Sequence, residues 1–81
     1  MTLANGVFSP TKLTIPTGKS LTLVFNGMGS DHLEIVQNGH VVAHSPLLNK
    51  GGTWHYTFQS KGTFTVEPQT MTYIHGTVTV K

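Results

Sequence analysis

The feature that most constrains this chain is the alternation of apolar and polar residues in short runs, which is clearest near its carboxyl end. Phe64 and Val66 alternate with polar residues, and Pro68 ends the run because proline has no amide hydrogen to donate. A second run, TVTV at residues 77–80, alternates in the same way. This period of two predicts a pair of half-buried strands joined by a loop over residues 69–75.

The same alternation recurs through the rest of the chain. Lys19–Asn26 is the strongest run, with three large apolar side chains on one face, and His32–Gln37 follows it after a loop. Asn38-Gly39 is a typical two-residue hairpin turn and leads into residues 40–44. Residues 53–58 alternate aromatic and polar side chains. These runs predict antiparallel strands that each bury one face.

Two weaker runs complete the expected set of strands. Thr2–Phe8 fits an edge strand that Asn5-Gly6 breaks or bulges, and a short strand is expected around Leu13 and Ile15. No segment has helical periodicity. We therefore predict one all-β domain, residues 1–81, folded as a sandwich of about seven or eight strands.

The alternation also predicts which side chains form the core. Lys19–Asn26 and His32–Gln37 are expected to be central, because their alternation of large apolar residues is uninterrupted. The expected core consists of Leu13, Ile15, Leu21, Leu23, Phe25, Leu33, Ile35, Phe58, Phe64, Val66, Val78 and Val80.

Composition excludes several classes of function. Only 10% of the residues are charged, and the chain has five scattered lysines and no arginine, whereas nucleic-acid binders cluster such side chains on one face. No apolar run is long enough to span a membrane, and no basic and apolar leader segment precedes the strands, so we expect any signal peptide to be already absent from this sequence. The three carboxylates form no obvious pair, and no nucleophile motif is present, so we expect no enzymatic activity.

Several short motifs together resemble the cupredoxins, the family of small blue-copper β-sandwiches. Phe8-x-Pro10, Pro16-x-Gly18 and a strand ending in Asn26 are similar to the amino half of that family. Lys61-Gly62-Thr63-Phe64, followed by a short loop and Gly76, is similar to its carboxyl half. The resemblance extends over the whole chain and implies a Greek-key β-sandwich.

The same resemblance implies where copper ligands would lie. In the family, the residue that matches His32 is the first ligand, and the residue that matches Asn26 tethers the ligand loop by hydrogen bonds. Aligned to the short amicyanin-type loop, Pro68 stands at the cysteine position, Met71 at the second histidine and Ile74 at the methionine. The chain has no cysteine, so it cannot form the thiolate bond of a blue copper site.

Four residues remain as candidate metal ligands: His32, Met71, His75 and Met28. Imidazole and thioether together suit Cu(I) better than Cu(II), because Cu(I) is a soft ion. Each residue also has a plain structural interpretation. His32 and Glu34 are expected to point outward, since Leu33 and Ile35 are the apolar pair of their strand. Met71 and Met28 can fill gaps in packing, and His75 can be a solvated surface residue.

Three other histidines, His40, His44 and His55, are expected on strands away from this loop. Two functions follow as alternatives from the resemblance. The first is a copper-binding protein with a thiolate-free site, which handles copper or transfers electrons. The second is a metal-free cupredoxin fold that serves as a structural or interaction module. Either would have a metal ion or another protein as its partner and would be exported to the periplasm or the cell exterior.

Overall fold

The computed structural model describes residues 1–27 and 29–81, and within them it contains eleven β-strands and no helix. The described part of the chain has no helix long and apolar enough to cross a membrane. The strands are β1 (Thr2–Ala4), β2 (Val7–Ser9), β3 (Lys12–Ile15), β4 (Ser20–Phe25), β5 (Ser30–Asp31), β6 (Leu33–Gln37), β7 (His40–His44), β8 (Leu48–Asn49), β9 (Gly52–Thr57), β10 (Gly62–Pro68) and β11 (Gly76–Val80).

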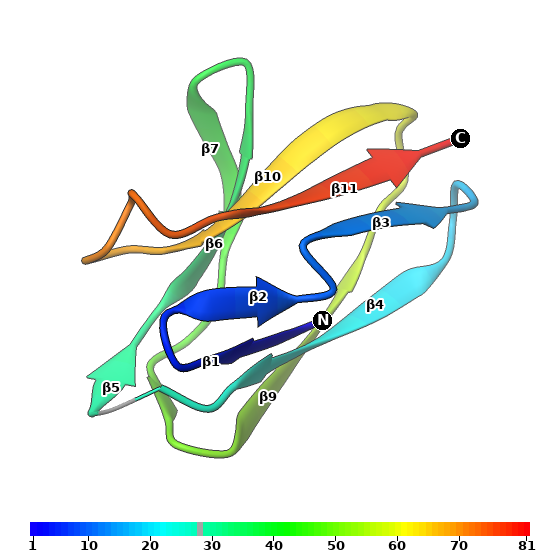
Figure 1. Ribbon diagram of the computed structural model, residues 1–81. Helices are drawn as coiled ribbons and strands as arrows, with labels where there is room; N and C mark the ends of the chain where they lie inside the picture. The colour runs from blue at the N-terminus through cyan, green and yellow to red at the C-terminus, as the bar shows by residue number, and fades with distance from the viewer. Residues whose placement is uncertain (28) are drawn as a thin grey trace.

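Two main sheets face each other and form a sandwich (Figure 1). The first has the strand order β2-β1-β4-β9, and the second has the order β3-β11-β10-β6-β7. The two-residue strands β5 and β8 pair separately. The loop between β10 and β11 lies at the end of the molecule opposite the C-terminus (Figure 1). The predicted all-β sandwich is confirmed, and β4 and β6 are inner strands of their sheets.

The structure has more strands than the seven or eight expected, because the run over residues 2–8 forms two strands and the two-residue strands β5 and β8 were not expected. The expected edge strand over residues 2–8 is two strands, β1 and β2, paired antiparallel. Asn5 and Gly6 adopt positive φ angles of 54° and 78°, which allow the two-residue turn between them. β1 also pairs in parallel with β4, so β2 is the edge strand.

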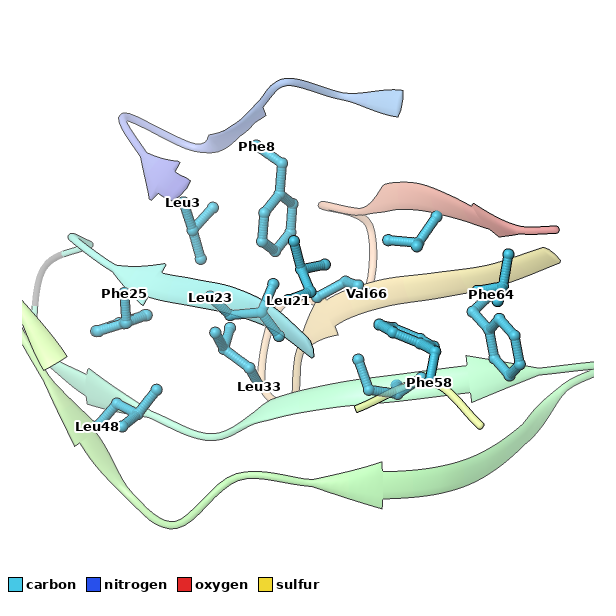
Figure 2. Packing of buried hydrophobic residues seen from close by; sticks show 13 residues of the cluster. Leu3, Phe8, Leu21, Leu23, Phe25, Leu33, Leu48, Phe58, Phe64 and Val66 are labelled. Atoms are coloured by element: carbon cyan, nitrogen blue, oxygen red, sulfur yellow. The ribbon is translucent and has the colours of Figure 1, made fainter. Parts of the chain in front are cut away.

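The core lies between the two sheets, where the inward side chains of both meet (Figure 2). Ten of the twelve residues expected in the core are buried there. Leu13 and Ile15 are only partly buried, since β3 is an edge strand with one neighbour. Leu3, Phe8 and Leu48 are buried although the alternation did not predict them. Their strands are only two or three residues long, which is too short for a periodic signal.

A buried carboxylate ties the loop between β10 and β11 to the start of β6. Asp31 is only 3% exposed, and its Oδ1 accepts a hydrogen bond of 2.8 Å from the amide of His32. Its Oδ2 accepts a hydrogen bond from the Thr70 hydroxyl. The amide of Gln69 also donates to the carbonyl oxygen of His32, at 2.8 Å. The loop is therefore held against β6 by protein atoms of both main chain and side chain.

The expectation that Asn26 tethers this loop was wrong. The side chain of Asn26 is exposed and makes no hydrogen bond to the described loop residues, while its main-chain amide donates to the carbonyl oxygen of Leu3 and joins the end of β4 to β1. The tether is supplied by Asp31, because the burial of Leu33 and Ile35 places Asp31 on the inward face of the same extended segment.

We expect Phe25→Ala to lower the free energy of unfolding by about 3–5 kcal/mol, because the fully buried ring leaves a cavity when it is removed. Urea denaturation followed by circular dichroism measures this loss. Val42→Ala, at a side chain 48% exposed, is the control and should change the free energy by less than about 0.5 kcal/mol. Equal losses in both variants would contradict the packing described.

We expect Asp31→Ala to destabilise the fold by about 1–3 kcal/mol, because it leaves the His32 amide without its acceptor. Amide hydrogen exchange in residues 69–75 should rise in the same variant. Thr70→Val removes only one of the two bonds and serves as the partner in a double-mutant cycle. Additive effects of the two substitutions would show that the Asp31–Thr70 contact does not hold the loop.

Candidate functional site

The loop between β10 and β11 is where the resemblance predicts metal ligands. Pro68, at the position of the family's cysteine, is buried at the end of β10 and lies opposite Leu33 of β6. Two turns follow it, since the amide of Met71 donates to the carbonyl of Pro68 at 3.3 Å and the amide of Ile74 to that of Met71 at 3.0 Å. Hydrogen bonds within the protein thus define the shape of this loop.

Met71 and Ile74 line an open hollow of about 410 Å³ at this end of the sandwich. Its other walls come from the β1–β2 turn, from the segment after β4 and from Lys50. The hollow combines an apolar floor with two amide side chains and one ammonium group. Its complete lining is Leu3, Asn5, Gly6, Asn26, Gly27, Lys50, Met71 and Ile74.

The other described candidate ligands do not line the hollow that contains Met71. His75 is exposed and lines a separate hollow of about 260 Å³, together with Val7 and Tyr73. Met28 lies outside the described residues. His32 does not line the hollow that contains Met71. Of the set His32, Met71, His75 and Met28, only Met71 among the described members lines this hollow.

His32 lies on the outer side of the second sheet, as the alternation predicts. Leu33 and Ile35 are fully buried, whereas His32 and Glu34 are half-buried. The Nδ1 atom of His32 lies 2.8 Å from the carbonyl oxygen of Ser45, and a carbonyl oxygen can only accept. Nδ1 therefore carries the proton, and Nε2 of the neutral ring keeps its lone pair for another partner.

The expectation that His44 lies away from this end of the molecule was wrong. The rings of His32 and His44 are neighbours, with centroids 6.4 Å apart and planes at 75°. The antiparallel pairing of β6 and β7 brings His44 back beside the start of β6, opposite Glu34. His40 lies at the other end of the same hairpin, opposite Gln37. His55 is on β9 of the other sheet and bonds Thr22 at 2.9 Å.

The sequence analysis missed two residues that shape this end of the molecule, Asp31 and Ser45, which are the buried polar residues of the structure's described part. Ser45 is 1% exposed, and its hydroxyl accepts from the amide of Leu33 at 2.8 Å while its carbonyl faces His32. Alternation could have identified Asp31, since it has the same parity as Leu33 and Ile35. No sequence signal points to Ser45, which follows β7 in an irregular stretch.

The residues at the loop end do not fit a blue copper centre. Such a centre needs a thiolate and two imidazoles, and the loop supplies Pro68, Met71 and Ile74 at the corresponding positions. Within residues 1–27 and 29–81, no three histidine, aspartate or glutamate side chains already stand close enough together to hold a metal ion. A site with three such ligands within these residues therefore requires side chains to reorient.

Comparison with known proteins identifies the fold. No family model matches the sequence, and no curated protein matches it either. Among solved structures, the chain is similar to a purple cupredoxin from Nitrosopumilus maritimus, with 27% identity, a TM-score of 0.83, and coverage of 98% of this chain and 86% of that one.

Two other similar structures share the fold at lower identity. An oxidised methionine-to-leucine variant of amicyanin gives 17% identity and a TM-score of 0.83, with 99% of this chain and 78% of that chain covered. A copper-containing nitrite reductase from Thermus scotoductus gives 20% identity and a TM-score of 0.80, with 99% and 21% covered. The chain is therefore a cupredoxin-like protein, one that lacks the cysteine and most of the other copper ligands of the family.

Proposed function

We propose that this chain is a small copper-binding protein with a thiolate-free site, in which His32 is the anchoring ligand. It handles copper, or transfers electrons slowly, and has no catalytic activity of its own. We also propose that it is exported to the periplasm or the cell exterior, as its similarity to cupredoxins suggests. Its partner there would be copper or a copper-carrying protein. The cupredoxin fold is the scaffold for this function.

One observation carries the proposal, namely the fixed orientation of the His32 ring. Its Nδ1 is bound to the Ser45 carbonyl, and its own carbonyl accepts from Gln69 of the loop. Metal-ligating histidines characteristically donate their second ring nitrogen to a carbonyl or carboxylate, because that bond fixes the tautomer and the direction of the ligating nitrogen. The His32 ring has this arrangement through its contact with Ser45.

A second candidate function, the metal-free interaction module, is favoured by a different observation. The bond between Asp31 and Thr70 holds the loop against β6, and Pro68 is packed where a thiolate would be. In this alternative, hydrogen bonds and packing within the protein hold the loop in place, and no ion is needed for its shape. In this alternative, the hollow that contains Met71 is the surface that meets the partner.

We expect Cu(II) to give no intense blue or purple colour with this protein. The strong charge-transfer band of such sites requires a copper–thiolate bond, and the chain contains no cysteine. Optical and electron paramagnetic resonance spectra of the Cu(II) titration measure this, and we expect only a faint band with a nitrogen and oxygen type of signal. An intense band in the thiolate region would refute the thiolate-free assignment.

We expect the parent protein to bind one Cu(I) ion and His32→Ala to lose at least about tenfold in affinity, because a principal ligand is removed. Competition with a chromophoric Cu(I) chelator measures the affinity. Met71→Leu tests whether the thioether is the second ligand. His55→Ala is the matched control, since His55 lies on the other sheet and bonds Thr22.

The pattern of losses decides between the two functions. Loss in His32→Ala together with full binding in His55→Ala supports the copper-binding protein. Equally weak binding by the parent and all variants would favour the metal-free module, and amide shifts on adding partner proteins would then be sought around the Met71 hollow.

A further inference from the structure

Three ionisable side chains lie in a row across the outer face of the second sheet. Glu34 of β6 lies directly opposite Glu67 of β10 on one side and directly opposite His44 of β7 on the other. Residues directly opposite in an antiparallel ladder share a face, and their Cβ atoms lie about 4.5–5.5 Å apart. His32 precedes Glu34 by two residues, so it extends this row along the same face.

The pairing of Glu34 with Glu67 is unfavourable by itself. Like charges directly opposite each other destabilise a sheet, and these are the only two glutamates of the chain. Neither ladder neighbour of Glu34 is a lysine, since they are Glu67 and His44. This face of the sheet therefore concentrates negative charge in a protein of net charge +2. A bound cation would relieve that repulsion.

The two imidazoles beside this pair are oriented by one main-chain group. The carbonyl oxygen of Ser45 lies 2.8 Å from Nδ1 of His32 and 3.4 Å from Nδ1 of His44. Because a carbonyl oxygen only accepts, it favours the tautomer with a proton on Nδ1 in both rings. Both Nε2 atoms then keep their lone pairs, which is the form that ligates a metal ion.

We propose that His32, Glu34 and His44 form a site for a divalent cation of the zinc type on the outer face of β6 and β7. Two ligands two residues apart on one strand, with a third opposite on the next strand, supply two imidazoles and one carboxylate. That donor set suits Zn²⁺ and Cu²⁺, and a fourth position stays open to water. Glu67 lies opposite Glu34 and adds negative charge without being required as a ligand.

The inference rests on the proposed function, because it keeps His32 as the anchoring ligand. It replaces the Met71 thioether with Glu34 of β6 and His44 of β7. The site forms only when the side chains of His44 and Glu34 rotate toward the fixed His32 ring, because the two ring centroids are 6.4 Å apart and no three such side chains of the described residues stand close enough as they are. Such rotation is accessible, since His44 is exposed and Glu34 is half-buried. The ion links β6 to β7 and should stabilise this edge of the sheet.

Zinc chloride titration of the whole chain tests the site, with calorimetry for affinity and thermal unfolding for stabilisation. We expect one Zn²⁺ per chain, and a loss of at least about tenfold in affinity for each of His32→Ala, His44→Gln and Glu34→Gln. The rise in Tm on adding zinc should be smaller in these variants, since a ligand at free concentration c stabilises the folded state by RT ln(1 + c/Kd) and a larger Kd lowers that term. Binding should also weaken on acidification, because the ligands must be deprotonated.

His40→Gln is the matched control, because His40 is on the same strand but opposite Gln37 at the far end of the hairpin. It should change zinc affinity by less than about twofold, within the scatter of substitutions remote from a site. A second readout does not depend on the ion: Glu34→Gln should raise the Tm of the metal-free protein, since it removes the repulsion with Glu67.

The outcomes separate this inference from the proposed function. Losses in the three ligand variants with an unchanged His40→Gln support the site. Cu(I) binding that depends on His32 and Met71, with zinc affinity unaffected by His44→Gln and Glu34→Gln, would overturn the inference and leave the proposed function intact. A parent that binds neither Cu(I) nor Zn²⁺ would overturn both.

Discussion

The burial of Leu33 and Ile35 is the constraint from which the chemistry of this molecule follows. Both side chains are fully enclosed between the sheets, so the segment around them cannot shift by one residue without exposing them. That fixed register turns Asp31 inward and His32 and Glu34 outward. A hydrophobic requirement therefore decides which polar groups meet the loop and which meet the neighbouring strand.

On the inner side, Asp31 holds the loop between β10 and β11 against the start of β6. Asp31 is removed from water, yet both of its oxygens accept hydrogen bonds, which offsets the cost of burying a carboxylate. In the family that the chain resembles, this loop carries copper ligands. Here its shape is set by its own turns and by the hydrogen bond between Thr70 and Asp31. The apolar and polar residues around Met71 leave an open hollow beside it. Hydrogen bonds within the protein therefore supply contacts that position this loop.

On the outer side, the same register assembles a row of imidazole and carboxylate groups. Antiparallel pairing returns β7 alongside β6, so that His44 lies beside His32 and opposite Glu34. One carbonyl oxygen, that of the buried Ser45, orients both rings. The metal site that we propose therefore lies on the surface of the sheet and not in the loop. The donors there are nitrogen and oxygen, which suit borderline divalent ions better than Cu(I).

The sequence by itself determined the all-β class, most of the core, the Asn38-Gly39 hairpin and the absence of a thiolate site, because alternation, turn chemistry and composition are local properties. It also predicted the outward direction of His32. The tertiary structure alone decided which side chains meet across strands: that Asp31 and not Asn26 tethers the loop, that Leu3, Phe8 and Leu48 are buried, and that His44 joins His32. These contacts link residues far apart in the chain, and their partners are set by strand pairing and packing that no local pattern encodes.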